Sequence, residues 1–240
     1  MRTMGSASRA TYNCRSEVRG QIAEANTPKV NKNAESSSSY LCNLTSDLCN
    51  GTSMADLASQ YLEEIKRQFR GHKRMGEAAM AQLEDMDFFV TLDPESNSVA
   101  ALVKHIAGNA RSRFTDFLTS DGEKPDRFRD QEFEVSAKTT REEVLRWWEQ
   151  AWSHVFSALD SLQPEDVQRT VTIRQEAHTV MQALNRALAH YAQHIGQIVF
   201  LAKHLRASQW HTLTIPRGKS EDYKAGSPKG FSRGTYDTKT

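Results

Sequence analysis

The sequence predicts an all-α protein whose main domain is a four-helix bundle. Four segments repeat apolar residues at the 3.6-residue spacing of a helix that buries one face. No segment shows a convincing alternation of apolar and polar residues, which would indicate a half-buried strand. With 240 residues, of which 38% are hydrophobic, the chain can bury one core of ordinary size. We therefore expect a bundle at residues 54–207, a disordered extension at residues 1–53 and an irregular tail at residues 208–240.

The N-terminal extension is rich in Ser, Asn and Thr and lacks sustained apolar periodicity. It cannot bury enough apolar surface to offset the entropy of ordering, so we expect it to be disordered. It holds all three cysteines of the chain but no apolar core of a secretory signal. The odd count argues against a disulfide framework and favours a reducing, cytoplasmic location. Met54, which opens the first periodic segment, is a candidate for the true start codon.

The first two helices follow from their apolar stripes. One stripe extends over residues 55–85 and the other over residues 98–118. Asn97 or Ser98 is the expected N-cap of the second helix, because short polar side chains accept hydrogen bonds from the free N–H groups of a first turn. Residues 119–138 follow as a polar linker that contains Gly and Pro.

The third helix is expected to begin near Thr139 or Thr140 and to end before Pro164. Thr140 followed by Glu143 has the pattern of a capping box, in which each side chain binds the backbone N–H of the other residue. The fourth helix is expected over residues 176–205, where another apolar stripe runs.

The connections between the predicted helices are long for a bundle. At roughly 12 to 22 residues they exceed the usual short helix–helix loops. They leave room for a crossover topology in place of a simple up-and-down meander. After the fourth helix the periodicity is lost, but three apolar residues are expected to dock back onto the bundle: Trp210, Leu213 and Ile215.

Charge and motifs exclude several partners. The formal net charge is +1, so no strong field draws the chain to nucleic acid or to a membrane surface, and no apolar run approaches the length of a membrane span. Gly218-Lys219-Ser220 matches the end of a phosphate-binding loop, but Leu213 stands where that loop needs glycine. We expect a small-molecule substrate. Trp147 points away from the apolar stripe of its helix and is a candidate contact in a homodimer.

Histidine spacing suggests a metal site. His190 and His194 are four residues apart, so they share one helix face and can bind one ion. His105 lies on the flank of the apolar stripe of the second helix, where side chains of facing helices converge. Spacing alone is weak evidence, because such pairs are often solvated or capping residues. The other histidines show no paired spacing: His72, His154, His178, His204 and His211.

The sequence around the histidine pair resembles a known family. Residues 185–198 read NRALAHYAQHIGQI, residues 215–220 read IPRGKS, and Trp210 precedes them. Together with the early histidine of the second helix, these residues resemble an uncharacterised bacterial branch of the DinB-like (YfiT-like) superfamily of metalloenzymes. The resemblance covers about residues 54–220 and leaves the N-terminal extension untouched.

This resemblance implies a four-helix bundle, often dimeric, with a triad of histidines that binds a divalent ion. The triad corresponds to His105, His190 and His194 of this sequence. Zinc or nickel is the expected metal, with iron or manganese as alternatives. Characterised members of the superfamily include thiol transferases that use bacillithiol or mycothiol, and a mycothiol-dependent isomerase. A low-molecular-weight thiol is therefore a candidate substrate.

Three protein ligands leave an open position on the ion, which is the pattern of a catalytic zinc site. We therefore expect a metal-dependent enzyme, either a bacillithiol-type S-transferase or a hydrolase. The alternatives are a non-catalytic metal-binding or stress-related bundle protein, and a structural bundle with no metal. Arg186, one turn before the histidine pair, and Arg217 are candidate substrate-binding residues. Asn109, one turn after the early histidine, is a candidate to orient that imidazole.

Overall fold

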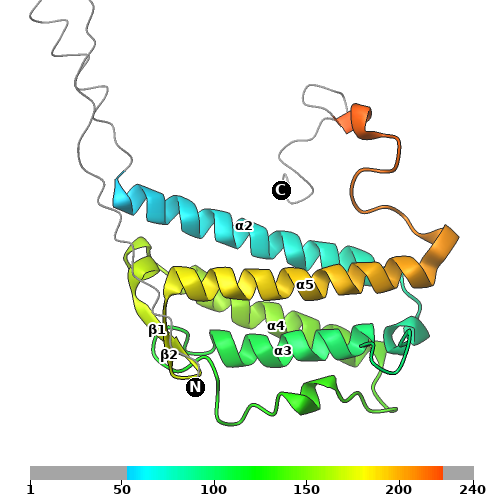
Figure 1. The fold of residues 1–240 in the computed structure, drawn as a ribbon, viewed down its shortest axis with the longest axis horizontal. Helices are drawn as coiled ribbons and strands as arrows, with labels where there is room; N and C mark the ends of the chain where they lie inside the picture. Colours follow the sequence, from blue (N-terminus) through cyan, green and yellow to red (C-terminus); the bar gives the residue numbers. More distant parts are fainter. Residues whose placement is uncertain (1–52, 224–240) are drawn as a thin grey trace, which may run out of the picture. The chain divides into compact units, whose positions relative to one another are not determined.

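The computed structural model describes residues 53–223 (Figure 1). Four long α-helices dominate this part of the chain, so the prediction of an all-α four-helix bundle is confirmed. The expectations for residues 1–52 and 224–240 lie outside the described residues. The four helices are α2 (Met54–Met80), α3 (Val99–Phe114), α4 (Arg141–Ser161) and α5 (Val180–Arg206).

Each of the four helices begins after a hydroxyl side chain that accepts a hydrogen bond from the backbone N–H three residues later. At the start of α3, Ser98 makes this bond, as its sequence predicts. At the start of α4, Thr140 Oγ1 accepts from the Glu143 N–H at 3.3 Å, which is half of the expected capping box. The helices α2 and α5 have complete capping boxes, built on Ser53 and Thr179.

The bundle contains the crossover that its long connections allow. In Figure 1, α2 and α5 run in one direction and α3 and α4 in the opposite direction. The helix α3 packs mainly against α4, and α2 mainly against α5. Because α3 and α4 are parallel, residues 115–140 must travel back along the bundle before α4 can begin. This crossover segment contains a short 3-10 helix at Asp130–Phe133.

A small β-hairpin corrects the predicted start of the fourth helix. β1 (Thr170–Ile173) pairs antiparallel with β2 (Glu176–Thr179), where a helix was expected from residue 176. Arg174 and Gln175 link the strands with φ values of 56° and 65°, as a tight two-residue hairpin turn requires. The helix therefore begins only at Val180.

Two other helices end earlier than predicted. The first was expected to reach residue 85, but α2 ends at Met80 and a short 3-10 helix follows at Asp85–Phe89. The second was expected to reach residue 118, but α3 ends at Phe114. Asp116 adopts a φ of 50°, which is incompatible with continuation of the helix.

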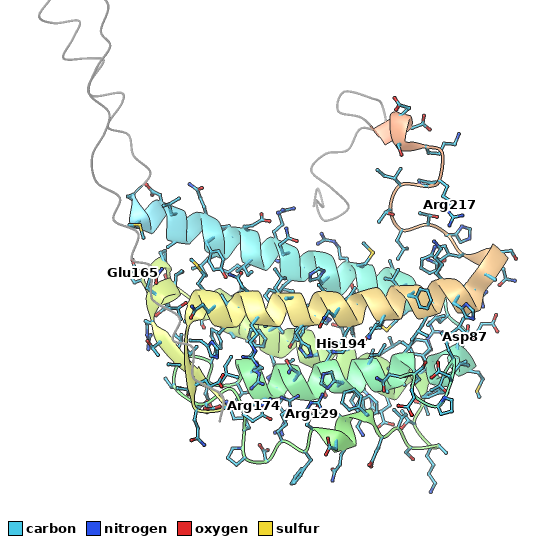
Figure 2. All side chains as sticks on the ribbon, viewed as in Figure 1. Asp87, Arg129, Glu165, Arg174, His194 and Arg217 are labelled. Carbon is cyan, nitrogen blue, oxygen red and sulfur yellow. The ribbon has the colours of Figure 1, made fainter. Side chains whose placement is uncertain are left out.

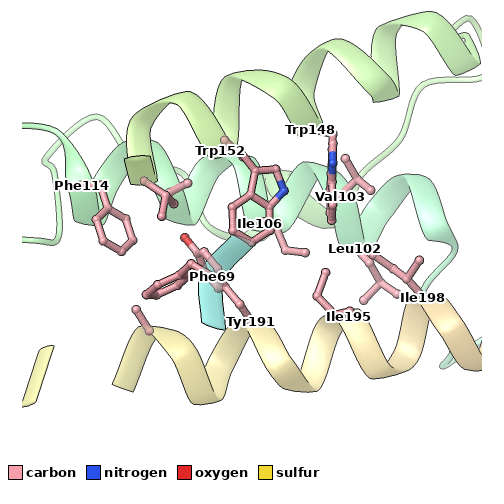
Figure 3. Packing of buried hydrophobic residues seen from close by; sticks show 14 of the residues in the cluster. Phe69, Leu102, Val103, Ile106, Phe114, Trp148, Trp152, Tyr191, Ile195 and Ile198 are labelled. Carbon is pink, nitrogen blue, oxygen red and sulfur yellow. The ribbon is translucent and has the colours of Figure 1, made fainter. Parts of the chain in front are cut away.

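Aromatic rings fill the centre of the bundle (Figure 3). The ring of Tyr191 meets those of Phe69 and Trp152 edge to face, with centroids 5.8 and 5.9 Å apart. These rings come from three different helices, so their contacts fix the helices to one another. Gly76 admits Trp148 into this core, because a Cβ at that position would lie 2.7 Å from its Cζ2 atom.

Asp121 ties the crossover segment to the β-hairpin. Its carboxylate accepts hydrogen bonds from the backbone N–H groups of Arg174 at 2.9 Å and Gln175 at 2.8 Å. The neighbouring Gly122 N–H donates to the Thr172 carbonyl at 2.8 Å. The left-handed turn of the hairpin is thus stabilised by a side chain about fifty residues away in the sequence.

Replacing Asp121 with asparagine is expected to destabilise the fold and to change its response to acid. Burial raises the pKa of Asp121, but backbone hydrogen bonds outweigh it and hold the pKa at about 2. A carboxyl whose pKa is lowered in the folded state stabilises the protein at pH values above its ordinary pKa near 4. That stability is lost as the pH falls toward 2. We expect D121N to lower the free energy of unfolding at pH 7 by about 1 kcal/mol.

Urea unfolding at a series of pH values measures this effect. In D121N the free energy of unfolding should depend less steeply on pH between about 4 and 2 than in the unmodified protein. Glu165→Gln is the matched control, because Glu165 is exposed and makes no ion pair with residues 53–223. Parallel pH profiles for D121N and the unmodified protein would contradict the role given to Asp121.

Candidate metal centre

The fold brings together the three histidines that the sequence singles out. His105 extends from α3, and His190 and His194 extend from successive turns of α5. The Nε2 atom of His190 lies 3.1 Å from that of His105 and 3.0 Å from that of His194. All three ligand atoms lie within 4.8 Å of one another. A tetrahedral zinc ion with bonds of about 2.0–2.1 Å needs nitrogen atoms about 3.3–3.4 Å apart, so the triad fits such an ion with small adjustments.

The tautomers of the triad also suit a cation. His105 Nδ1 donates to the Glu132 carboxylate at 2.8 Å, so its Nε2 presents a lone pair. His194 Nδ1 donates to Gln197 Oε1 at 2.8 Å, and its Nε2 likewise presents a lone pair. Both lone pairs face the Nε2 atom of His190 at about hydrogen-bond distance, yet one N–H group there can satisfy only one of them. A divalent ion would satisfy all three nitrogen atoms.

Burial keeps the two imidazoles of α5, His190 and His194, in the neutral form that binds metals. Desolvation, followed by the neighbouring histidines, lowers the pKa of His190 to about 3. Desolvation also lowers the pKa of His194. Burial raises the pKa of Glu132, but hydrogen bonds from His105 and Arg127 outweigh it and hold that pKa below its usual value. At neutral pH His190 and His194 are therefore neutral, while the Glu132 carboxylate behind His105 is ionised.

Glu132 is held firmly in its place behind His105. Arg127 donates to both of its oxygens, at 2.8 and 3.0 Å. Gly108, on the turn of α3 next to His105, leaves room for the carboxylate, since a Cβ there would lie 2.6 Å from Glu132 Cδ. The ring of Phe133 stacks on the His105 imidazole with centroids 4.5 Å apart. The crossover segment thus fixes both the tautomer and the ring orientation of His105, one of the three candidate metal ligands.

The expected orienting residue is replaced by another. Asn109 is buried and lies near the triad, but the hydrogen bond of His105 Nδ1 goes to Glu132. No sequence pattern points to Glu132, because it lies 27 residues from His105 in a polar segment without periodicity. Only the crossover topology brings it next to α3.

Replacing Glu132 with glutamine is expected to weaken metal binding by about 10–100-fold, the usual effect of removing an outer partner of a ligand histidine. The neutral amide cannot stabilise the Nδ1–H tautomer as a carboxylate does. Competition with a chelator of known affinity measures the change. Glu134→Gln serves as the control, since Glu134 is exposed on the same segment and its side chain makes no contact with the triad. Equal affinities in E132Q and E134Q would contradict the assignment.

A cavity of about 220 Å³ opens beside the triad. His105 and His190 form part of its wall, together with residues of β1, the crossover segment and the first turns of α5. A group bound in the cavity would therefore lie next to an ion held by the triad. Five arginines also line it: Arg113, Arg127, Arg129, Arg174 and Arg186.

The two predicted substrate-binding arginines occupy different places. Arg186 lines the cavity, one helical turn before His190. Arg217 does not line it and lies on the segment after α5, away from Arg129 and Arg174 in Figure 2. The substrate-binding roles of Arg186 and Arg217 stay predictions.

The fold and the site define a helical-bundle protein with three histidines that could hold a divalent ion. The chain belongs to DUF1572, a family of proteins of unknown function, whose family model matches residues 56–219. The match includes all three histidines and nearly the whole bundle. Comparison with curated proteins and with solved structures gives no significant match. Among residues 53–223, no helix has the length and apolarity that a membrane span requires.

Proposed function

We propose that this protein is a divalent-metal-dependent enzyme of the DinB-like superfamily, with the ion bound by His105, His190 and His194. The observation that carries the proposal is a three-histidine ligand set that borders a polar cavity. Among residues 53–223, no fourth histidine, cysteine or carboxylate joins this group. Structural zinc sites usually have four protein ligands, whereas three protein ligands leave a position for substrate or water.

The residues of the chain support this chemistry in separate ways. When bound, the ion would act as a Lewis acid and favour the anionic form of a thiol or water nucleophile. Glu132 keeps His105 in the ligand tautomer and in the correct orientation. The neutral imidazoles leave the charge of the ion undiminished, and the arginines of the cavity attract an anionic substrate.

The reaction class follows from the resemblance described above. Transfer of a low-molecular-weight thiol of the bacillithiol type to an electrophile is the leading reaction, and hydrolysis is the alternative. Zinc or nickel suits three imidazoles best, while iron or manganese is also compatible with nitrogen ligands and open positions.

Metal analysis of protein purified without an affinity tag tests the proposal. We expect about one divalent ion per chain, and activity in a screen that combines low-molecular-weight thiols with electrophiles such as monochlorobimane. A parallel screen of ester substrates tests hydrolysis. Substoichiometric metal that is unchanged in His190→Ala would contradict the site. Activity that survives the loss of all three histidines would contradict metal-centred catalysis.

A further inference from the structure

The cavity beside the triad has a strong excess of positive charge. Its wall contains five arginines and no aspartate or glutamate. Three carboxylates form ion pairs with these arginines: Glu123, Glu132 and the exposed Asp130. Among these arginines and their ion-pair partners, five guanidinium groups stand against three carboxylates, so positive charge is in excess before any metal ion is counted. A wall with an excess of guanidinium groups attracts anionic ligands.

One carboxylate is shared among three of the arginines. Glu123 Oε2 lies 3.0 Å from Arg113, 3.3 Å from Arg127 and 3.2 Å from Arg174. A single negative charge cannot neutralise three guanidinium groups. Glu123 instead holds them in a fixed arrangement. Burial lowers the pKa of Arg113, and repulsion from Arg127 and Arg174 acts in the same direction, against the opposing effect of Glu123.

The arginines differ in the donors that they can offer to a ligand. Each of the three nitrogens of Arg127 already contacts a carboxylate, because the side chain binds both oxygens of Glu132 and also Glu123. Arg174 binds Glu123 through Nε alone, which leaves its two terminal nitrogens. The Arg186 side chain is exposed at the cavity, and it makes no hydrogen bond or ion pair with any residue in the described range 53–223.

We propose that this cavity binds a divalent oxyanion, a phosphate monoester or dicarboxylate group of the substrate, with Arg186 and Arg174 as its direct ligands. This proposal names the substrate class of the enzyme proposed above and rests on that function. A dianion neutralises the excess charge of the wall. Phosphate and dicarboxylate oxygens match the planar fork of guanidinium donors. The group is anchored next to His190, so the rest of the substrate extends toward the metal position.

Anion binding is best measured in the absence of metal, so that the ion cannot be the ligand. Full-length, tag-free protein is stripped with a chelator, which is then removed by gel filtration. Isothermal titration calorimetry at constant ionic strength compares inorganic phosphate, malonate and acetate. We expect phosphate or malonate to bind about tenfold more tightly than acetate, and the preferred dianion identifies which oxyanion the site takes.

Single substitutions then locate the binding site. Arg186→Ala and Arg174→Ala should each weaken binding of the preferred dianion by about five- to thirtyfold, the effect of losing a partly exposed charge-assisted contact. Arg186→Lys should recover only part of the affinity, because an ammonium group lacks the planar fork. Arg146→Ala is the control, since Arg146 is exposed on α4 and does not line the cavity.

The possible results separate this proposal from the proposed function. Dianions that bind no more tightly than acetate, or that bind R186A and R174A as well as R146A, overturn the proposal. Dianion binding that appears only after metal is restored, and that R186A and R174A leave unchanged, also overturns it, because the ion would then be the ligand. Tight, arginine-dependent binding in a chain that never retains metal supports the anion site and refutes the metal-dependent enzyme.

Discussion

Replacing His190 with alanine is expected to abolish stable metal binding at neutral pH. The Nε2 atom of His190 is the central one of the triad, about 3 Å from both of the other ligand nitrogens. Without it, His105 and His194 remain as two ligands on different helices. The loss of metal affinity should therefore be larger than the loss of about 10–100-fold that is expected when an outer partner such as Glu132 is replaced.

Metal content after dialysis against a zinc buffer of fixed free concentration measures this loss. His204→Ala is the matched control, because His204 lies exposed on the same helix, where its ring stacks on Phe200. Circular dichroism of both variants separates loss of metal from loss of fold. One zinc ion per chain in H190A, at the same free zinc concentration as the unmodified protein, would rule out His190 as a ligand.

Replacing Trp152 with alanine is expected to lower the free energy of unfolding by about 3–5 kcal/mol, the range for removal of a large buried aromatic side chain. Trp152 is only 1% exposed and touches the rings of Phe69, Trp148 and Tyr191. Figure 3 shows it extending from α4 toward the rings of Phe69 and Tyr191, which belong to α2 and α5. The cavity left behind adds to the lost hydrophobic contact.

Chemical denaturation followed by circular dichroism measures this change. Trp147→Ala is the control, since Trp147 lies on the same helix but is only partly buried, and this change should cost roughly 1–2 kcal/mol. Trp152→Phe keeps most of the apolar volume and removes an indole N–H that has no acceptor within residues 53–223, so its effect should be clearly smaller than that of W152A. Equal destabilisation by W147A and W152A would contradict this description of the core.

The four helices could be predicted because each repeats its apolar residues with helical periodicity. The β-hairpin could not, since its strands have only four residues each and its turn is Arg174-Gln175 instead of a typical Asn-Gly or Asp-Gly pair. Asp121 supplies the stabilisation that this unusual turn needs, from a segment far away in the sequence. Such long-range support leaves no local pattern to recognise.

The metal centre could be predicted only in part. The spacing of His190 and His194 indicates a shared helix face, whereas His105 was assigned by resemblance and not by spacing. Glu132 comes from the 3-10 helix of the crossover segment, and three of the five arginines come from loops and turns, so their convergence depends on the path of the crossover segment. Residue type alone could not identify these arginines among the 31 lysines and arginines of the chain.

The crossover segment contributes to two binding sites at once. Glu132 orients a metal ligand, while Glu123 and Arg127 position the wall of the anion cavity. Both sites therefore require residues 115–140 to adopt the same ordered conformation. An ion that stabilises this order lowers the entropic cost of binding the anion, and by thermodynamic reciprocity the anion raises the affinity for the ion by the same factor. Metal and substrate should consequently bind this protein with positive cooperativity.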